Sequence, residues 1–227
     1  MKYKWILFDL DGTLFDYDKA EYTALETAFH FFGYELDQNK LQVYRKVNKK
    51  VWDDFEAHKI TAQRLRTKRF EMLAEELKMQ ADARTFSDIY LENLSQQNEL
   101  LDGALDILNY LHKKVGLVLV TNGLKEVQRS RLSGSEITPY FDHIVISDEI
   151  GVAKPHAEYF DHVFSIINFP DKKDVLIIGD NLSSDIVGGI NYKIDTCWFN
   201  YKKQQPDKEI LPTYIIHNLD EIKLLIK

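Results

Sequence analysis

The sequence predicts an α/β protein in which a doubly wound parallel sheet carries a helical insert, and three observations lead to this prediction. Five short apolar segments are typical of buried strands, helical patterns separate the later ones, and one long stretch near the N-terminus holds no convincing strand. Continuous apolar runs are expected in parallel strands, because helices cover both faces of such a sheet. Strands that alternate with helices indicate βα units, and hence this fold class.

The predicted strands are the segments in which apolar residues follow one another without alternation. They are residues 5–9, 116–121, 144–147, 175–180 and 196–199, and a weaker sixth is 213–216. Apolar residues recur at helical spacing before the second strand, at Leu105, Leu108 and Leu111, and again before the fourth, from Ala157 to Ile167. We therefore expect helices between the later strands.

The stretch from about Asp16 to Leu94 is rich in helix formers and predicts a helical insert after the first strand. Apolar stripes run from Ala24 to Phe32 and from Leu65 to Leu77, and Gly33 suits the end of a helix. We thus expect two domains. The sheet domain is formed by residues 1–15 and 95–227, and the insert by residues 16–94.

The charge balance limits the classes of partner. The chain has 227 residues, with 29 Lys and Arg against 36 Asp and Glu, which gives a formal net charge of −7. Apolar residues make up 44% and charged residues 29%, as in a soluble globular protein. The acidic balance argues against a nucleic-acid partner, because non-specific binding to the phosphate backbone needs a basic surface.

Cysteine usage and the absence of a long apolar stretch favour a cytoplasmic protein without a membrane partner. Cys197 is the single cysteine, so no internal disulfide can form, as is typical of a reducing compartment. It lies in an apolar run, and we expect an inert buried thiol rather than a nucleophile. The apolar run that begins at Trp5 stops at Asp9, and no segment approaches the ~18 residues of a membrane span.

Polar clusters follow four of the predicted strands. They are Asp9–Thr13, Thr121–Gly123, Gly151–Pro155 and Gly179–Asp185. The carboxyl ends of parallel strands meet at one edge of an open sheet, where ligands bind. We therefore expect these clusters to lie together although they are far apart in the sequence.

The residue types in these clusters suit phosphoryl transfer. Four of them are carboxylates whose mutual repulsion calls for a cation, namely Asp9, Asp11, Asp180 and Asp185. Oxygen ligands without nearby Cys or His favour Mg²⁺ over zinc. Lys154 and the hydroxyl of Thr121 suit the oxygens of a phosphoryl group, and a carboxylate can attack phosphorus to give an aspartyl phosphate. Together these residues predict Mg²⁺-assisted phosphoryl transfer.

Each cluster taken alone also has an ordinary structural interpretation. Asp9–Gly12 is typical of a turn, and Thr121–Gly123 of a turn or a helix start. Lys154 alone suits a solvated loop, and Asp180 and Asp185 a helix cap and a surface acid. Their occurrence in this order, each after a predicted strand, favours the functional interpretation.

At these residues the sequence resembles the haloacid dehalogenase superfamily of phosphatases. Asp9-Leu10-Asp11-Gly12-Thr13-Leu14 resembles its first motif, and Thr121, Lys154 and Gly179-Asp180-x₄-Asp185 resemble the second, third and fourth. The resemblance covers the whole chain. It implies a Rossmann-like core with the motif-four strand beside the motif-one strand, and a small helical C1-type cap in residues 16–94. Only 30 residues separate Gly123 from Lys154, too few for the alternative large cap of the superfamily.

The resemblance implies a role for each matched residue. Asp9 would be the nucleophile, and Asp11 the general acid and base, with its backbone carbonyl on Mg²⁺. Thr121 and the backbone amide of Asn122 would hold the phosphoryl oxygens, and Lys154 would offset the charge on Asp9 and the phosphate. Asp180 would bind Mg²⁺ directly, while Asp185 would order the waters of the metal. Dehalogenase members lack an acid at the position of Asp11, so its presence favours a phosphatase.

A narrower likeness points to a substrate class. Residues 179–186, 188–191 and 195–200 resemble the bacterial pyrimidine 5′-nucleotidase branch, which dephosphorylates deoxyuridine, thymidine and uridine monophosphates and some modified analogues. We therefore expect a small phosphomonoester as the partner. Four aromatic side chains of the insert either stack on the base or pack in the core, namely Tyr44, Trp52, Phe55 and His58. Residues 40–69 carry 10 basic and 3 acidic residues, which form a solvated face or attract the phosphate.

Other functions remain open at this point. A sugar-phosphate or phosphoglycolate-type phosphatase, or a phosphomutase, would share both Asp residues of the first motif. A receiver-like module phosphorylated on Asp is a non-enzyme alternative, although it has no use for a lid over its site. A catalytically idle scaffold is disfavoured because every motif residue is present. The oligomeric state and the preferred base and sugar stay undetermined.

Overall fold

A computed structural model describes all residues from 1 to 227, and it confirms the predicted α/β fold. Six strands form one sheet in the order β3-β2-β1-β4-β5-β6, and every neighbouring pair is parallel. The strands are β1 (Trp5–Phe8), β2 (Gly116–Thr121), β3 (His143–Ile146), β4 (Val175–Gly179), β5 (Asp195–Phe199) and β6 (Tyr214–Ile216).

The strand that carries the first motif lies in the middle of the sheet, beside the strand of the fourth motif, as the resemblance implies. Phe8 at the end of β1 is in register with Leu119 of β2 and Ile178 of β4. The residues that follow Phe8 therefore emerge between the ends of β2 and β4. This register brings the polar clusters to one edge of the sheet.

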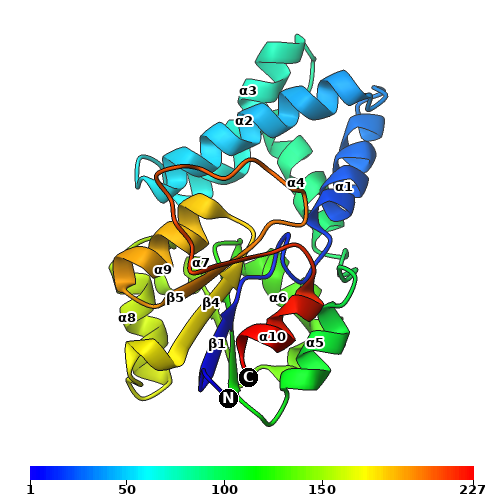
Figure 1. The fold of residues 1–227 in the computed structure, drawn as a ribbon. Coiled ribbons are helices and arrows are strands. Elements are labelled where there is room, and N and C mark those ends of the chain that lie inside the picture. The colour runs from blue at the N-terminus through cyan, green and yellow to red at the C-terminus, as the bar shows by residue number, and fades with distance from the viewer.

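Helices cover both faces of the sheet (Figure 1). On one face, Ile6 and Phe8 belong to a buried cluster with Leu108 of α5 (Ala104–Leu111) and Ile222 of α10 (Ile222–Leu225). On the other face, Leu7 packs in a cluster that includes α8 (Ala157–Ile166). Alternate residues of one strand thus enter two apolar cores, which explains why the strand sequences are continuously apolar.

The stretch between β1 and the rest of the sheet consists of four helices, namely α1 (Tyr17–Phe31), α2 (Gln38–Glu56), α3 (Ala62–Leu77) and α4 (Ala83–Leu94). Each begins at a side-chain cap, provided in order by Asp16, Asp37, Thr61 and Asp82. Gly33 follows α1 with φ +76°, a conformation that glycine adopts without strain. These helices bury a cluster of their own, to which Leu124 and Val127 from the sheet side also belong.

The insert stands beyond the carboxyl edge of the sheet, and α1 and α4 rise side by side from it (Figure 1). The remaining helices are α6 (Lys125–Ser133), α7 (Ser147–Ile150) and α9 (Val187–Tyr192), with 3₁₀ turns η1 (Thr138–Tyr140), η2 (Lys172–Asp174) and η4 (Leu219–Glu221) and a π-helical turn η3 (Leu182–Ile186). None of the helices combines the length and the apolar character that a membrane span requires.

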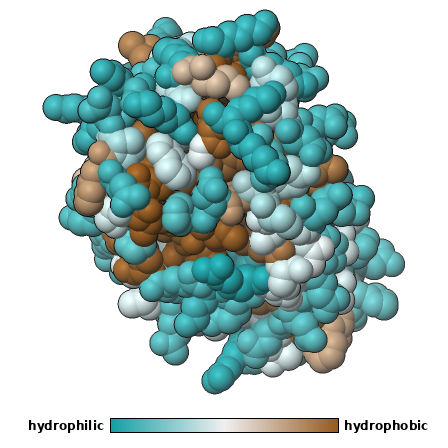
Figure 2. Space-filling model, turned by 90° about the horizontal axis from the view of Figure 1, so that it is seen from below, coloured by the Kyte–Doolittle hydropathy of each residue, from teal (hydrophilic) through white to brown (hydrophobic).

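The opposite end of the molecule, where both chain termini lie, has a different character (Figure 1). Seen from below, apolar surface gathers in one area ringed by hydrophilic side chains (Figure 2). A wide groove of about 530 Å³ at the amino ends of the strands is lined by residues such as Met1, Trp5 and His143. None of the polar clusters predicted from the sequence reaches this groove, so the candidate chemistry lies at the other end.

Candidate active site

The residues singled out in the sequence come together at the carboxyl edge of the sheet. Six of them line one cavity of about 220 Å³, namely Asp9, Asp11, Thr121, Asn122, Lys154 and Asp180. Asp185 lies beside it, with no exposed surface, and contacts Lys154. The structure thus joins all seven predicted site residues in one constellation.

The loop after β1 is fixed to the loop after β4. The hydroxyl of Thr13 donates to Oδ2 of Asp9 at 3.2 Å and accepts the backbone N–H of Asp180 at 3.1 Å. Gly12 lies so close that a Cβ atom there would be 2.4 Å from Oδ2 of Asp180, and its φ of +82° also favours glycine. This turn therefore sets the distance between the two acidic loops.

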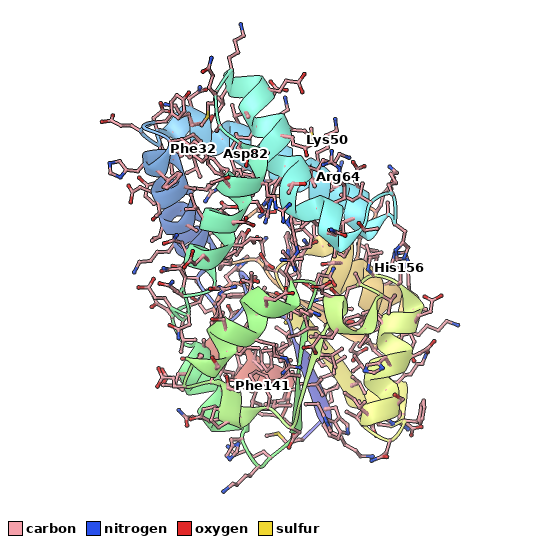
Figure 3. All side chains as sticks on the ribbon, turned by 180° about the vertical axis from the view of Figure 1, so that it is seen from behind. Phe32, Lys50, Arg64, Asp82, Phe141 and His156 are labelled. Atoms are coloured by element: carbon pink, nitrogen blue, oxygen red, sulfur yellow. The ribbon has the colours of Figure 1, made fainter.

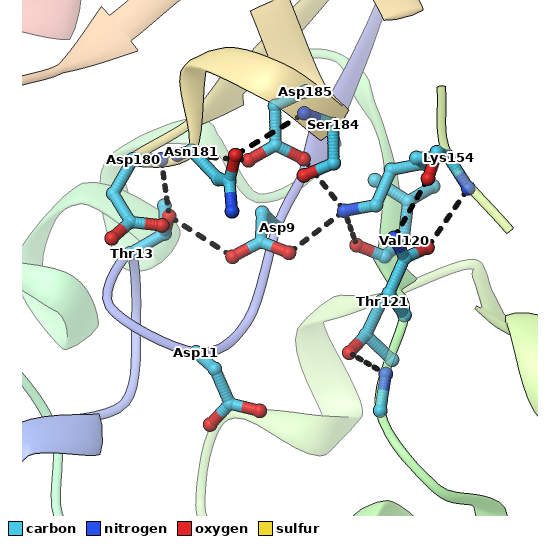
Figure 4. Close-up of polar contacts among 12 residues, drawn as sticks. Asp9, Asp11, Thr13, Val120, Thr121, Lys154, Asp180, Asn181, Ser184 and Asp185 are labelled. Carbon is cyan, nitrogen blue, oxygen red and sulfur yellow. Dashed lines mark hydrogen bonds and ion pairs between the residues drawn. The ribbon is translucent and has the colours of Figure 1, made fainter. Parts of the chain in front are cut away.

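Lys154 is the buried cation at the centre of the site (Figure 4). Its Nζ donates to Oδ1 of Asp9 at 2.8 Å, to Oδ1 of Asp185 at 2.6 Å and to the carbonyl of Val120 at 2.8 Å. Burial alone would lower the pKa of Lys154, but the charges of Asp185 and Asp9 outweigh it and the pKa is raised. The ammonium group is therefore held charged, with all three of its protons in use.

Asp185 is held in place from beneath the site. Its Oδ2 accepts the backbone N–H of Asn181 at 3.2 Å, while its Oδ1 binds Lys154. A Cβ atom on Gly179 would lie 2.2 Å from Oδ2 of Asp185, so only glycine leaves room for this carboxylate. The π-helical turn η3 supplies Asp185 at this position.

Three carboxylates lie close together, and the single charge of Lys154 does not balance their combined negative charge. Asp9, Asp180 and Asp185 each offer one oxygen, and these oxygens all lie within 4.8 Å of one another. Burial, together with the neighbouring acids, raises the pKa of Asp9 to about 7 and the pKa of Asp180 well above its usual range. Asp180 forms no ion pair within the chain, and oxygen donors without Cys or His suit Mg²⁺. The donor set therefore fits this metal.

Asp11 is held by two side chains of α6 that the sequence analysis did not identify. Gln128 donates to Oδ2 of Asp11 at 2.6 Å, and Arg131 forms an ion pair with Oδ1. The same Nε2 of Gln128 lies 3.0 Å from Oγ1 of Thr121. A spacing of three residues puts Gln128 and Arg131 on one side of α6, just after the Thr121 cluster, and this was the available signal.

Thr121 and the side chain of Asn122 have different roles at the end of β2. Oγ1 of Thr121 accepts from Gln128 and from the backbone N–H of Gly123 at 3.1 Å, which leaves its hydroxyl proton free to donate into the cavity. The amide of Asn122 pairs with the backbone N–H and C=O of Lys154, both at 2.9 Å. The end of β2 and the Lys154 loop are thereby joined.

The insert forms the opposite wall of the cavity with Tyr17, Asn48, Trp52 and Glu56. Glu56 accepts from Nδ2 of Asn122 at 3.2 Å, and burial raises the pKa of Glu56 to about 6. The backbone carbonyl of Glu56 lies 2.7 Å from Nε2 of His156, which lies where the insert meets the sheet side (Figure 3). These contacts close the insert over the strand ends.

Of the four aromatic side chains considered for base stacking, Trp52 alone lines this cavity. Tyr44 is fully buried in the core of the insert against Phe70, as a core aromatic would be. Phe55 packs edge-on against Trp52, and His58 stacks on His156.

The basic stretch of residues 40–69 is mostly neutralised. Arg45, Lys49, Arg64, Arg66 and Lys68 each pair with carboxylates. Lys50 and Arg64 lie on the insert helices (Figure 3), and neither lines the cavity. Lys46, Lys50 and Arg69 form no ion pair, and Arg69 differs from the two exposed lysines in its position. It is buried and lines a second, smaller cleft that adjoins the cavity.

Comparison with known proteins gives consistent matches along the whole chain. The family model described as haloacid dehalogenase-like hydrolase matches residues 6–199. Pyrimidine 5′-nucleotidase YjjG of Escherichia coli is 34% identical over 226 residues, which cover 100% of this chain and 99% of that protein. Pyrimidine 5′-nucleotidase PynA of Streptococcus pneumoniae is 35% identical over 223 residues, covering 98% of this chain and 94% of that protein.

A solved structure shows a similar fold throughout. The putative HAD-hydrolase YfnB of Bacillus subtilis superimposes with a TM-score of 0.93 at 35% identity, with both chains fully covered. That crystal structure is bound to magnesium and reveals an interdomain movement.

Proposed function

The chain belongs to the haloacid dehalogenase-like hydrolase family and is a phosphomonoester hydrolase, and from this premise we propose that it is a Mg²⁺-dependent 5′-nucleotidase for pyrimidine nucleoside and deoxynucleoside monophosphates. The observation that carries the proposal is the constellation around Lys154. A carboxylate, Asp9, lies in a cavity beside a buried cation, two further acids and a free hydroxyl donor. The full-length similarity to two pyrimidine 5′-nucleotidases supports the substrate class.

In the proposed reaction, one oxygen of Asp9 attacks phosphorus while the bond to the leaving alcohol breaks, and Asp11 gives its proton to that alcohol. The product is an aspartyl phosphate and a free nucleoside. Asp11 then takes a proton from water, whose oxygen attacks phosphorus, and the bond to Asp9 breaks to release inorganic phosphate. Thr121 and the backbone N–H of Asn122 hold the transferring oxygens, and Lys154 keeps Asp9 oriented and offsets its charge.

Asp9, the backbone carbonyl of Asp11 and Asp180 would hold Mg²⁺, with Asp185 ordering its waters. The ion supplies positive charge that offsets the phosphate and the crowded carboxylates.

We also propose that residues 1–15 and 95–227 form a catalytic core and that residues 16–94 form a cap. The separate buried cluster of the four insert helices supports this assignment. So does the pairing of the two connecting segments, where Phe15 bridges to Leu100 and the N–H of Asp16 donates to the carbonyl of Glu99.

A substrate panel tests the proposed function. With Mg²⁺ present, we expect kcat/KM for dUMP, dTMP and UMP to exceed that for purine monophosphates and sugar phosphates, and chelation of the metal to stop turnover. If a sugar phosphate or phosphoglycolate leads by about tenfold or more, a difference equal to about 1.4 kcal/mol, the nucleotidase assignment is wrong. Formation of an isomerised sugar phosphate instead of inorganic phosphate would indicate a phosphomutase.

A further inference from the structure

Arg69 of α3 is a buried cation without an anionic partner. Its side chain is 2% exposed, and it forms no ion pair with any carboxylate of the chain. Nη1 donates to Oδ1 of Asn48 at 3.1 Å, and the guanidinium lies over the rings of Phe70 and Tyr90, at 5.0 and 4.9 Å from their centres. Nε is buried and has no acceptor. Buried charges are normally paired, so this arrangement needs an explanation.

The other buried cations of the chain differ from Arg69 in this respect. Lys154 pairs with Asp9 and Asp185, and Arg131 pairs with Asp11. The buried acid in the same insert, Glu21, is bound by Arg45 at 2.8 Å. Glu21 acts on Arg69 only at a distance and forms no ion pair with it, so the place of a direct partner for the guanidinium is open to a ligand.

The surroundings of Arg69 show where that partner would enter. Arg69 lines a cleft of about 30 Å³, and four residues line both this cleft and the catalytic cavity, namely Asp11, Tyr17, Trp52 and Gly123. The two spaces therefore adjoin. A cleft of this size holds about one or two water-sized groups, which fits an exocyclic substituent but not a ring. Asn48, the partner of Arg69, lines the larger cavity.

We propose that Arg69 binds a carbonyl oxygen on the base of the nucleotide, which projects into this cleft while the ring lies in the larger cavity against Trp52. This inference rests on the proposed function and names a residue that selects the substrate. A guanidinium has donors only, so it recognises a keto oxygen and cannot accept from an N–H group. Because Oδ1 of Asn48 is occupied by Arg69, the free Nδ2 of Asn48 is a second donor to the base.

The test compares a substrate that carries a base with one that lacks it. In the full-length enzyme with Mg²⁺, kcat/KM is measured for dUMP and for 2-deoxyribose 5-phosphate, and their ratio is formed. The ratio does not depend on the fraction of active enzyme, so a partly unfolded variant remains informative. We expect Arg69→Met to lower the ratio about 10- to 100-fold, the loss typical of a charge-assisted hydrogen bond. The exposed Arg84 of the same insert is the control, and Arg84→Met should keep the ratio of the unaltered enzyme.

A second variant separates ligand binding from a purely structural role. Asn48→Asp supplies the missing carboxylate without a change in size, so the guanidinium gains an internal ion pair. We expect the melting temperature to hold or rise while the ratio falls as in Arg69→Met. If Arg69 only packs between aromatic rings, both variants keep the ratio, and the inference is wrong. A ratio near one in the unaltered enzyme would instead overturn the proposed nucleotidase function itself.

Discussion

Asp9 and Lys154 show how single residues depend on contacts that a sequence does not display. The motifs predict that both belong to the site, but the structure adds that Lys154 is shared between Asp9 and Asp185, at 2.8 and 2.6 Å. Asp185 thus keeps Lys154 in place when Asp9 changes its charge. Burial raises the pKa of Asp9 to about 7 in the absence of a metal, so a cation in the site favours the ionised, nucleophilic form.

The first prediction concerns the nucleophile. Asp9→Asn should lower the hydrolysis of an aryl phosphate with Mg²⁺ by about 10³-fold or more, because the amide cannot form the covalent intermediate. The fold should survive, since Lys154 retains Asp185 and Val120 as partners. Steady-state kinetics and the circular dichroism spectrum measure both effects. Asp171→Asn, at an exposed acid, is the control, and undiminished activity in Asp9→Asn would disprove the mechanism.

The second prediction concerns the support of the general acid. Gln128→Leu removes the donor that joins Asp11 and Thr121. In the proposed mechanism, a misoriented Asp11 matters most when the leaving group needs a proton. We expect kcat/KM for an alkyl phosphate such as dUMP to fall about tenfold, as for the loss of one charge-assisted hydrogen bond, and for 4-nitrophenyl phosphate to change far less. Equal losses for both substrates would show that Gln128 serves only the fold or the binding of phosphate.

Gln128, Arg131 and Arg69 also mark the limit of sequence reasoning at this scale. The strand-end motifs are recognisable in the sequence, because polar residues that follow the apolar run of a parallel strand usually belong to a ligand site. By contrast, Gln128 and Arg131 lie within a helix, and their partner Asp11 is 117 and 120 positions away. Their spacing on one side of the helix is a weak signal, because solvated helix residues often share it. Burial, which only the folded chain reveals, identifies them.

At the scale of elements, the strands were predictable and the π-helical turn was not. Each of the five main predicted strands agrees with the structure to within one residue at either end, because a polar residue or glycine ends the apolar run. The π-helical turn η3 (Leu182–Ile186) leaves no such signature. It depends on contacts such as that of Asp185 with Lys154, and π turns occur often at functional sites. The local sequence predicts where an element lies, whereas contacts within the site determine the π-helical geometry of η3.

The third prediction tests the turn after β1. Gly12→Ala adds a side chain at φ +82°, 2.4 Å from Oδ2 of Asp180, so the carboxylate has to move. We expect the Mg²⁺ concentration for half-maximal activity to rise about tenfold, as when a ligand is misplaced. Backbone strain should also cost about 1 kcal/mol, or about 2–4 °C in melting temperature.

Gly33→Ala is a matched control for this variant. Gly33 has a similar φ of +76°, but no atom lies within 4 Å of the added Cβ. It should lose a similar amount of stability and keep the Mg²⁺ dependence of the unaltered enzyme. If the two alanine variants respond to Mg²⁺ alike, the approach of Gly12 to Asp180 has no part in metal binding.

At the scale of the whole molecule, the acidic charge and the anionic substrate are reconciled by where the charges lie. The net charge of −7 includes Asp9, Asp11, Asp180 and Asp185, which the proposed metal and Lys154 offset. The basic stretch of the insert looked able to attract phosphate as a whole, but most of it forms ion pairs on the insert surface. The resemblance implies that the insert caps the site, but its contacts with the sheet side were beyond sequence reasoning, because they join single residues far apart in the chain.

The last prediction follows from the way the insert closes the cavity. Tyr17, Asn48 and Trp52 of the insert line the cavity opposite the strand ends, so we expect movement of the insert to widen the way in for a nucleotide. The contacts that hold it closed are partly polar, such as Glu56 with Asn122 and with His156, and partly apolar, where Leu124 and Val127 pack into the insert cluster, so opening has to separate both kinds. The four helices keep their own core and can move as one body about the connecting segments, residues 15–18 and 95–99.

We therefore expect Mg²⁺ with vanadate, a phosphate mimic, to favour the closed form and slow cleavage of the connecting segments by a broad-specificity protease several-fold. Mass spectrometry of the fragments locates the cuts. The exposed turn around Lys173, remote from the insert, should be cut at the same rate with and without the mimic. Equal protection of both sites would indicate general stabilisation, and no change at either would mean that closure is independent of the phosphoryl group. Slower cleavage confined to the connecting segments would tie cap movement to occupancy of the site around Asp9, because no other ligand is present in the experiment.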